Sequence, residues 1–380
     1  MSLPLRALGA GVLLGLLPAL AAGAGQDLPR RARAAYDRAL ALEAAGDFSA
    51  ALTLLWEAAG LAPRDPDIQR GLGDALERLG ALDAAVDAYR RALAERPDDP
   101  RTSDRLILTL VKAGKGDEAV ARARALVAAR PDDPARHFTL GLALSEQHVD
   151  EALATFRRVL ELSPRHALAR YNLALVLKRS DRLQEAADEL RRSLAIEPRA
   201  ESHYSLGVVE WHLGRADPAV AALREALALQ PGYADAHYTL GAILKEKRDW
   251  KGAAQALRRA IALRPDLWSA HYTLARVLEL SGDAAAARAR LAEAERLRGR
   301  AQLEHEALVW TSVGIERLDA GDPLRALDLF RRATATFDAY APAHYQLGRA
   351  LAALGEPDAA RAAFARAYEL NPSLVPPTRF

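Results

Sequence analysis

A recurring segment of 34 residues constrains the fold of this chain more than any other feature of its sequence. The motif HYSLG begins at His203, HYTLG at His237 and HYTLA at His271, and HYQLG follows at His344. The same register extends in both directions and divides almost the whole chain into ten units. These units are residues 32–65, 66–99, 100–133, 134–166, 167–199, 200–233, 234–267, 268–301, 307–340 and 341–374.

Four positions of the unit, numbered from 1, keep their character along the chain. Position 7 is leucine or valine in all units but the first, where it is Arg38, and position 8 is glycine or alanine except at Ile107. Position 20 is alanine in every unit, provided that one residue is deleted before Ala152, and position 32 is usually proline. Small and apolar residues thus recur at fixed places in each unit.

The spacing of these residues predicts two helices in every unit. Positions 4, 7, 8 and 11 lie on one stripe of a first helix, and positions 20, 24 and 27 lie on one stripe of a second. Small residues at positions 8 and 20 allow the two helix axes to approach closely. Glycine followed by aspartate, as at Gly46 and Asp47, ends the first helix and caps the second. We expect Asp217, followed by Pro218, to cap a second helix in the same way.

One such hairpin cannot be stable alone. Ordering 34 residues costs about 50 kcal/mol, which requires burial of roughly 2,000 Å² of apolar surface. A hairpin with a single packed face cannot bury that area, so each hairpin must stack on its neighbours. The sequence therefore predicts an all-α solenoid.

The pattern at positions 4, 7, 8, 11, 20, 24, 27 and 32 resembles the tetratricopeptide repeat over residues 32–374. The resemblance implies a right-handed superhelical solenoid of about ten helical hairpins. It also implies that positions 2, 5, 9 and 12 of the first helix line a concave groove in which segments of partner proteins bind. The expected organisation is a linker at 25–31, repeats 1–8 at 32–301, an insertion at 302–306, repeats 9 and 10 at 307–374 and a tail at 375–380.

The pattern is interrupted between repeats 8 and 9. Gly299 stands where most units have proline, and residues 302–306 are additional to the flanking units. The segment ERLRGRAQLEHEALVWTSVG, which crosses this joint, can therefore continue as a helix. We expect a hinge or a lengthened helix near Gly299.

Aromatic and basic side chains gather on the expected groove stripe in the second half of the chain, at positions 5, 9 and 12. Tyrosine provides a large amphipathic contact with few rotors to freeze. The candidates for contact with a partner are Tyr171, Tyr204, Trp211, Tyr238, Lys245, Tyr272, Arg276, Tyr345 and Arg349. In the alternative interpretation, the tyrosines only pack against the neighbouring helix. No set of Lys, Asn and Arg matches a carboxylate clamp, so that narrower mode of peptide binding is not expected.

Histidine recurs at position 4, as His137, His203, His237, His271 and His344. Successive members belong to different hairpins, about 10 Å apart, whereas zinc ligands converge within about 2.1 Å of one ion. We therefore expect these histidines to pack structurally, and we predict no metal and no other cofactor.

Catalysis by this chain is not expected. A glycine-rich phosphate loop needs a strand that feeds a helix, and no strand pattern is present. The absence of cysteine removes disulfides and thiolate chemistry. The 52 basic and 50 acidic residues leave a net charge of +2, without the concentrated cationic face of a nucleic-acid binder.

The first 24 residues predict a secretory signal peptide. Arg6 precedes an apolar stretch from Ala7 to Ala22. The small residues Ala22, Gly23 and Ala24 stand at the end of this segment, as at a cleavage site. This stretch is shorter than the ~20 residues that a membrane span needs. We expect cleavage after Ala24 and a periplasmic or secreted protein; the alternative is an uncleaved N-terminal anchor, followed by a cluster of arginines.

Together these features favour a non-catalytic scaffold or adaptor in the cell envelope that binds protein or peptide segments in its groove. The alternative is an accessory subunit of an envelope enzyme, or of a secretion or glycan-assembly complex, in which another chain supplies the catalysis. The uncapped last repeat, near Tyr368 and Leu374, also favours a homodimer. Contact with a membrane is expected only through a partner or an uncleaved N-terminus, and no nucleic-acid partner is expected.

Overall fold

The computed structural model describes residues 16–371 and residue 374, and all regular structure in this part of the chain is helical. Residues 1–15 of the expected signal peptide and the tail at 375–380 lie outside the described residues. Residues 25–31, expected as a linker, belong to the first helix. None of the described helices combines the length and the apolar character that crossing a bilayer requires.

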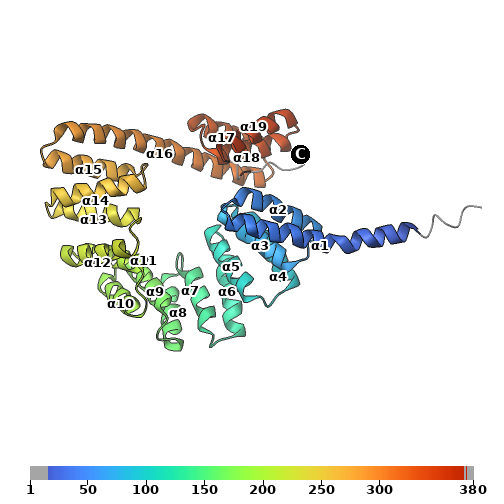
Figure 1. The fold of residues 1–380 in the computed structure, drawn as a ribbon, viewed down its shortest axis with the longest axis horizontal. Coiled ribbons are helices and arrows are strands. Elements are labelled where there is room, and N and C mark those ends of the chain that lie inside the picture. Colours follow the sequence, from blue (N-terminus) through green and yellow to red (C-terminus); the bar gives the residue numbers. More distant parts are fainter. Residues whose placement is uncertain (1–15, 372–373, 375–380) are drawn as a thin grey trace, which may run out of the picture. The chain divides into compact units, whose positions relative to one another are not determined.

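The nineteen helices found among the described residues belong to two compact units, residues 1–148 and 149–380, called here the N-terminal unit and the C-terminal unit (Figure 1). The N-terminal unit contains α1 (Leu16–Ala44), α2 (Phe48–Leu61), α3 (Pro66–Arg78), α4 (Leu82–Glu95), α5 (Pro100–Lys112), α6 (Gly116–Ala129) and α7 (Pro134–Leu144). The C-terminal unit contains α8 (Val149–Leu162), α9 (Ala167–Arg179), α10 (Leu183–Ile196), α11 (Ala200–His212), α12 (Ala216–Leu229), α13 (Ala234–Glu246), α14 (Trp250–Leu263), α15 (Trp268–Leu280), α16 (Ala284–Asp319), α17 (Pro323–Thr336), α18 (Ala341–Ala353) and α19 (Pro357–Leu370).

A tight turn joins the two helices of most hairpins at position 15, where the backbone φ is positive. Glycine occupies this position in most repeats, as at Gly214 with φ 75°, and Arg248 adopts φ 62° where glycine is absent. The Asp47 carboxylate accepts a hydrogen bond from the Ala50 amide at 3.1 Å, which confirms that cap. The expected cap at Asp217 is wrong: α12 starts two residues after Gly214, so Asp217 lies inside the first turn.

The small residue at position 8 lies directly against the side chain at position 24 of the same hairpin. A Cβ atom added to Gly73 would lie 2.6 Å from Tyr89 Cε1, and one added to Gly207 would lie 2.7 Å from Leu223 Cγ. Both distances are shorter than any normal carbon contact. The predicted close approach of the two helices is therefore confirmed.

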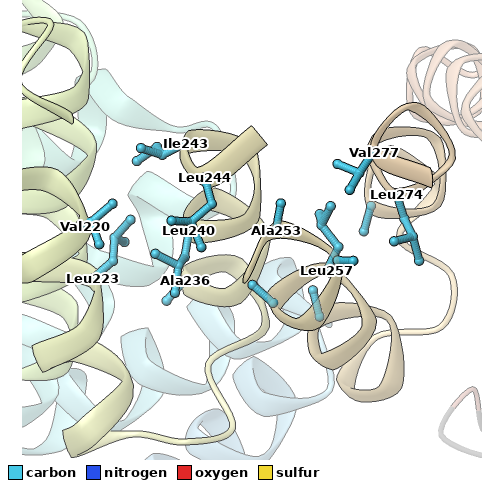
Figure 2. Close-up of a cluster of buried hydrophobic side chains, with 14 of the residues drawn as sticks. Val220, Leu223, Ala236, Leu240, Ile243, Leu244, Ala253, Leu257, Leu274 and Val277 are labelled. Carbon is cyan, nitrogen blue, oxygen red and sulfur yellow. The ribbon is translucent and has the colours of Figure 1, made fainter. Parts of the chain in front are cut away.

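Consecutive hairpins share one apolar core, as expected for stacked repeats. In the C-terminal unit, the side chains of Leu223, Leu240, Leu257 and Leu274 come from four successive helices and are almost fully buried. Figure 2 shows them in a row that continues from one repeat to the next. Each repeat therefore depends on its neighbours for burial.

The joint between repeats 8 and 9 is a single helix, α16, of 36 residues. Its first part buries Ala294 and Leu297 and its last part buries Ala307 and Thr311, whereas residues 298–306 between them are all exposed. Of the two alternatives predicted for Gly299, the lengthened helix is the one found. The exposed middle is held by its own backbone hydrogen bonds.

Gly207→Ala and Gly299→Ala are expected to change stability in opposite directions. A methyl group at position 207 would press on Leu223 and on the Ala219 carbonyl oxygen, which costs about 1–3 kcal/mol. A Cβ added at Gly299, which lies inside α16, would have no heavy atom within 4 Å. Alanine there therefore raises the free energy of unfolding by about 1 kcal/mol through its higher helix propensity. Urea denaturation followed by circular dichroism checks both signs; a Gly207→Ala variant as stable as the wild type would contradict the packing argument.

Candidate functional site

Three first helices of the N-terminal unit, α1, α3 and α5, form a groove of about 710 Å³. Positions 5, 9 and 12 of repeats 1 and 2 line it, together with position 2 of repeat 3, as the family resemblance implied. The lining residues are Tyr36, Leu40, Glu43, Arg70, Gly71, Asp74, Glu77, Arg78, Arg101, Arg105 and Lys112. This surface is the N-terminal groove of the text that follows.

Basic side chains outnumber acidic ones in the N-terminal groove, and most of them are paired between repeats. Arg78 contacts Glu43 at 3.1 Å, and Lys112 contacts Glu77 at 2.6 Å. Arg101 is exposed, and its guanidinium has no ion pair among the described residues. The groove therefore offers a cation to an acidic ligand without breaking an existing pair.

A buried hydrogen-bond network fixes the floor of the N-terminal groove. The hydroxyl of the fully buried Tyr89 donates to Asp74 at 2.7 Å and to Glu77 at 3.1 Å, and Thr109 also donates to Glu77. Burial by itself raises the pKa of Glu77, but hydrogen bonds from Lys112, Tyr89 and Thr109 outweigh it and leave that pKa below its ordinary value. Burial and the two carboxylates raise the pKa of Tyr89. Glu77 therefore stays ionised at neutral pH, held by these three donors.

Four of the tyrosines predicted as ligand contacts are half-buried in the C-terminal unit, namely Tyr171, Tyr204, Tyr238 and Tyr345. The Tyr204 ring lies 4.9 Å from the ring of Tyr233, and Tyr238 packs against the shared core. Tyr345 meets Phe364 edge-on at 5.3 Å, and burial raises its pKa. Burial, with Tyr204 and Tyr171 nearby, raises the pKa of Tyr233 to about 12. These rings are therefore engaged in packing within the C-terminal unit.

Three of the other candidates are half-buried as well, and two of these three already have partners. Trp211 Nε1 donates to Glu246 Oε2 at 2.9 Å across one repeat, and Arg349 donates to Gln346 at 2.9 Å. Lys245 lies half-buried in the last turn of α13.

Tyr272 and Arg276, four residues apart on α15, present their side chains together on an exposed helix face. Within the described residues, Arg276 pairs only with Glu279 of the same helix. Of the nine candidates, these two offer the most surface to a ligand.

The recurring histidines bind the loop that joins one repeat to the next. The Nε2 atoms of His137, His237 and His271 lie 2.7–3.1 Å from the carbonyl oxygens six residues earlier, at position 32 of the preceding repeat. Gln69 donates to the Pro63 carbonyl oxygen in the same way, at 3.0 Å. The expected structural role is confirmed for these residues. No cluster of three or more His, Asp or Glu suited to a metal ion occurs in the described part of the chain.

Sequence reasoning overlooked the basic residues of the N-terminal groove, such as Arg101 and Arg105. On a helix surface they resemble a solvated charged face. A usable signal was present, because Arg70 and Arg101 occupy stripe positions 5 and 2 of adjacent repeats.

Three family models, each described as tetratricopeptide repeat, match the chain. One matches residues 36–100, 190–234 and 314–374, a second matches 80–141 and 143–206, and a third matches 234–267. Together they span well over half of the sequence. No curated protein matches the chain.

Several solved structures share the helical repeat. A tetratricopeptide repeat protein from Parabacteroides merdae has 17% identity and a TM-score of 0.52, covering 66% of this chain and 99% of its own. A thermophilic TPR protein from Thermus thermophilus has 27% identity and a TM-score of 0.43, covering 47% and 99% respectively. YrrB, described as a TPR protein with an unusual peptide-binding site, has 20% identity and a TM-score of 0.42, covering 46% and 91%. The first of these supports the fold observed here.

Replacing His237 with glutamine is expected to reduce the loss of stability on mild acidification. Burial lowers the pKa of His237, so below about pH 6.5 the unfolded chain takes up the proton first and the folded state loses stability. Glutamine keeps the donor, as Gln69 shows, but does not titrate. The melting temperatures at about pH 7 and about pH 5.5 should differ less in His237→Gln than in the wild type. The matched control is His305→Gln, on the exposed part of α16; an equal change there would contradict the assignment.

Proposed function

Because the chain belongs to the tetratricopeptide repeat family, we propose that it is a non-catalytic scaffold that binds a segment of a partner protein along its first helices. The N-terminal groove carries this proposal. It is formed by three successive first helices, its floor is fixed by part-buried hydrogen bonds, and Arg101 at its edge has no ion pair with any described residue. A pre-organised surface loses little entropy on binding.

The partner segment carries carboxylates. The groove is lined by five basic and three acidic side chains, so an acidic segment gains attraction from the excess of positive charge. Glu43 and Glu77 are already engaged by Arg78 and Lys112, which leaves Arg101 to meet the ligand. In the C-terminal unit, Tyr272 and Arg276 provide a second point of contact with a partner.

The setting is the cell envelope, reached through the N-terminal signal peptide, in the periplasm or after secretion. The basis is the order of Arg6, the apolar stretch and Ala24 in the sequence. N-terminal sequencing of the exported protein tests it. A chain that begins at Gly25 supports cleavage, and one that begins at Met1 supports the anchored alternative.

An accessory role in an envelope enzyme or a secretion complex is the second candidate function. Proximity crosslinking in the host followed by mass spectrometry separates the two. Repeated recovery of one envelope enzyme favours the accessory role, whereas a diverse set of clients favours the scaffold.

A homodimer through the last repeat, where Tyr368 is exposed on α19, predicts twice the chain mass in light scattering.

Arg101→Glu is expected to weaken binding of the crosslinked partner segment at least tenfold, because it replaces an unpaired cation in the groove with a repelling charge. Isothermal titration calorimetry with a synthetic peptide of that segment measures the change. The matched control is Arg130→Glu, an exposed arginine of the same unit outside the groove. The melting temperature should be unchanged in both variants. Equal affinities for the wild type and Arg101→Glu would remove the N-terminal groove as the binding site.

A further inference from the structure

A second groove, of about 540 Å³, lies in the C-terminal unit between two second helices, α12 and α14, above the first helix α13. It is lined by residues of all three helices and is called the outer groove. Its lining residues are Arg224, Leu227, His237, Leu240, Leu244, Asp249, Gly252, Gln255, Ala256, Arg258, Arg259 and Ala262. It therefore uses the second helices, which the proposed scaffold function leaves free.

The floor of the outer groove is apolar. Leu240 and Leu244 of α13 and Ala256 of α14 are buried, and Leu227 of α12 is half-buried beside them. The backbone groups of all three helices are engaged in their own helical hydrogen bonds. A ligand in this groove consequently meets side chains, with few free backbone donors or acceptors.

The rim of the outer groove is cationic and unpaired. Arg224, Arg258 and Arg259 are exposed, and none of them has an ion pair within the described residues. Helix α14 contains no acidic residue. The carboxylate of Asp249, which precedes α14, accepts a hydrogen bond from the Gly252 amide at 2.9 Å and so caps the helix.

Several arginines at the same two positions of other repeats are neutralised, although Arg331 on α17 has no ion pair among the described residues. Arg191 and Arg192 on α10 pair with Asp188 and Glu189. Arg90 on α4 pairs with Glu118 at 2.8 Å. The unpaired arginines of the outer groove are therefore not a general consequence of the repeat.

A comparable hollow in the N-terminal unit, between α4 and α6 above α5, shows what stacking alone produces. Its volume is about 310 Å³, and Arg122, its one basic lining residue, pairs with Glu118. The hollow is thus smaller and lacks a free cation. The outer groove is larger than this hollow and, unlike it, has unpaired arginines at its rim.

We propose that the outer groove docks an amphipathic helix of a partner protein, with leucine-type side chains on one face and Asp or Glu beside them. A helix satisfies its own backbone hydrogen bonds, as a groove without free backbone partners requires. Its apolar side chains reach the recessed leucines between the ridges of α12 and α14. Its carboxylates meet Arg224, Arg258 and Arg259. A flat lipid surface matches the cations but cannot enter the recess.

The test uses the full chain and a fluorescein-labelled peptide of about five helical turns, with leucines at helical spacing and glutamates on either side of them. A scrambled peptide of the same composition and a peptide with lysine in place of glutamate are the ligand controls. Fluorescence anisotropy is expected to show saturable binding of the first peptide only, weakened by salt because the rim is exposed. Equal binding of the scrambled peptide, or no binding of the designed one, would overturn the proposal.

Arg258→Glu with Arg259→Glu is expected to raise the Kd of the designed peptide about tenfold. The matched control is Arg331→Glu with Arg332→Glu, which changes the same two positions of α17. Equal weakening by the two pairs would mean unspecific attraction and would contradict the proposal. Ala262→Trp, at an exposed position of the lining, should also block binding while leaving helicity unchanged.

Two further outcomes separate the outer groove from other sites. Arg101→Glu should leave the affinity for the designed helix unchanged. The proposals for the N-terminal groove and for the outer groove can therefore be contradicted independently. Binding to vesicles of phosphatidylglycerol tests whether a membrane occupies the outer groove. Binding to vesicles that is lost in Arg258→Glu with Arg259→Glu, without binding of the designed helix, would identify a lipid surface as the occupant and reject the proposal.

Discussion

The contact between a glycine at position 8 and the side chain at position 24, made in five hairpins of the described residues, is the constraint on which the rest of this molecule depends. With no Cβ at Gly207, the Leu223 side chain lies against the backbone of the facing helix, so the two helices pack as one layer. Stacking of such layers buries the shared core and leaves two kinds of surface, one made only of first helices and one that includes second helices. The N-terminal groove and the outer groove are examples of each.

A second constraint fixes the step between layers. A donor at position 4 reaches the carbonyl oxygen at position 32 of the preceding repeat, as His237 does with Pro231 and Gln69 with Pro63. Because proline at position 32 ends the helix before it, that carbonyl lacks a partner in its own helix. The recurrence of histidine at position 4 thus follows from hydrogen bonding between adjacent repeats. This role does not require the histidines of successive repeats to lie close to one another.

The fold could be predicted from the sequence because it depends on short-range periodicity. The 34-residue spacing, the small residue at position 8 and the irregular joint at Gly299 all have local signatures. The sites depend on contacts between residues about one repeat apart, such as Arg78 with Glu43, which no local pattern reveals. Glu210 illustrates the difficulty: it interrupts the apolar stripe of its repeat, yet it is buried in the structure with Arg191 and Arg215 around it. Pairing of this kind also decides which arginines remain available to a ligand.

The bare middle of α16 alters how the C-terminal unit responds to heat or force. In a stack of repeats, cooperativity comes from the interface between neighbours, and each interface adds its own coupling energy. Residues 298–306 replace such an interface with a stretch of solvated helix that has the modest intrinsic stability of any isolated helix. The side-chain contacts of this stretch include Arg298 over the Trp268 ring and Arg300 over the Phe337 ring. The last two repeats are therefore tethered to repeat 8 by one continuous helix with a thin lateral interface.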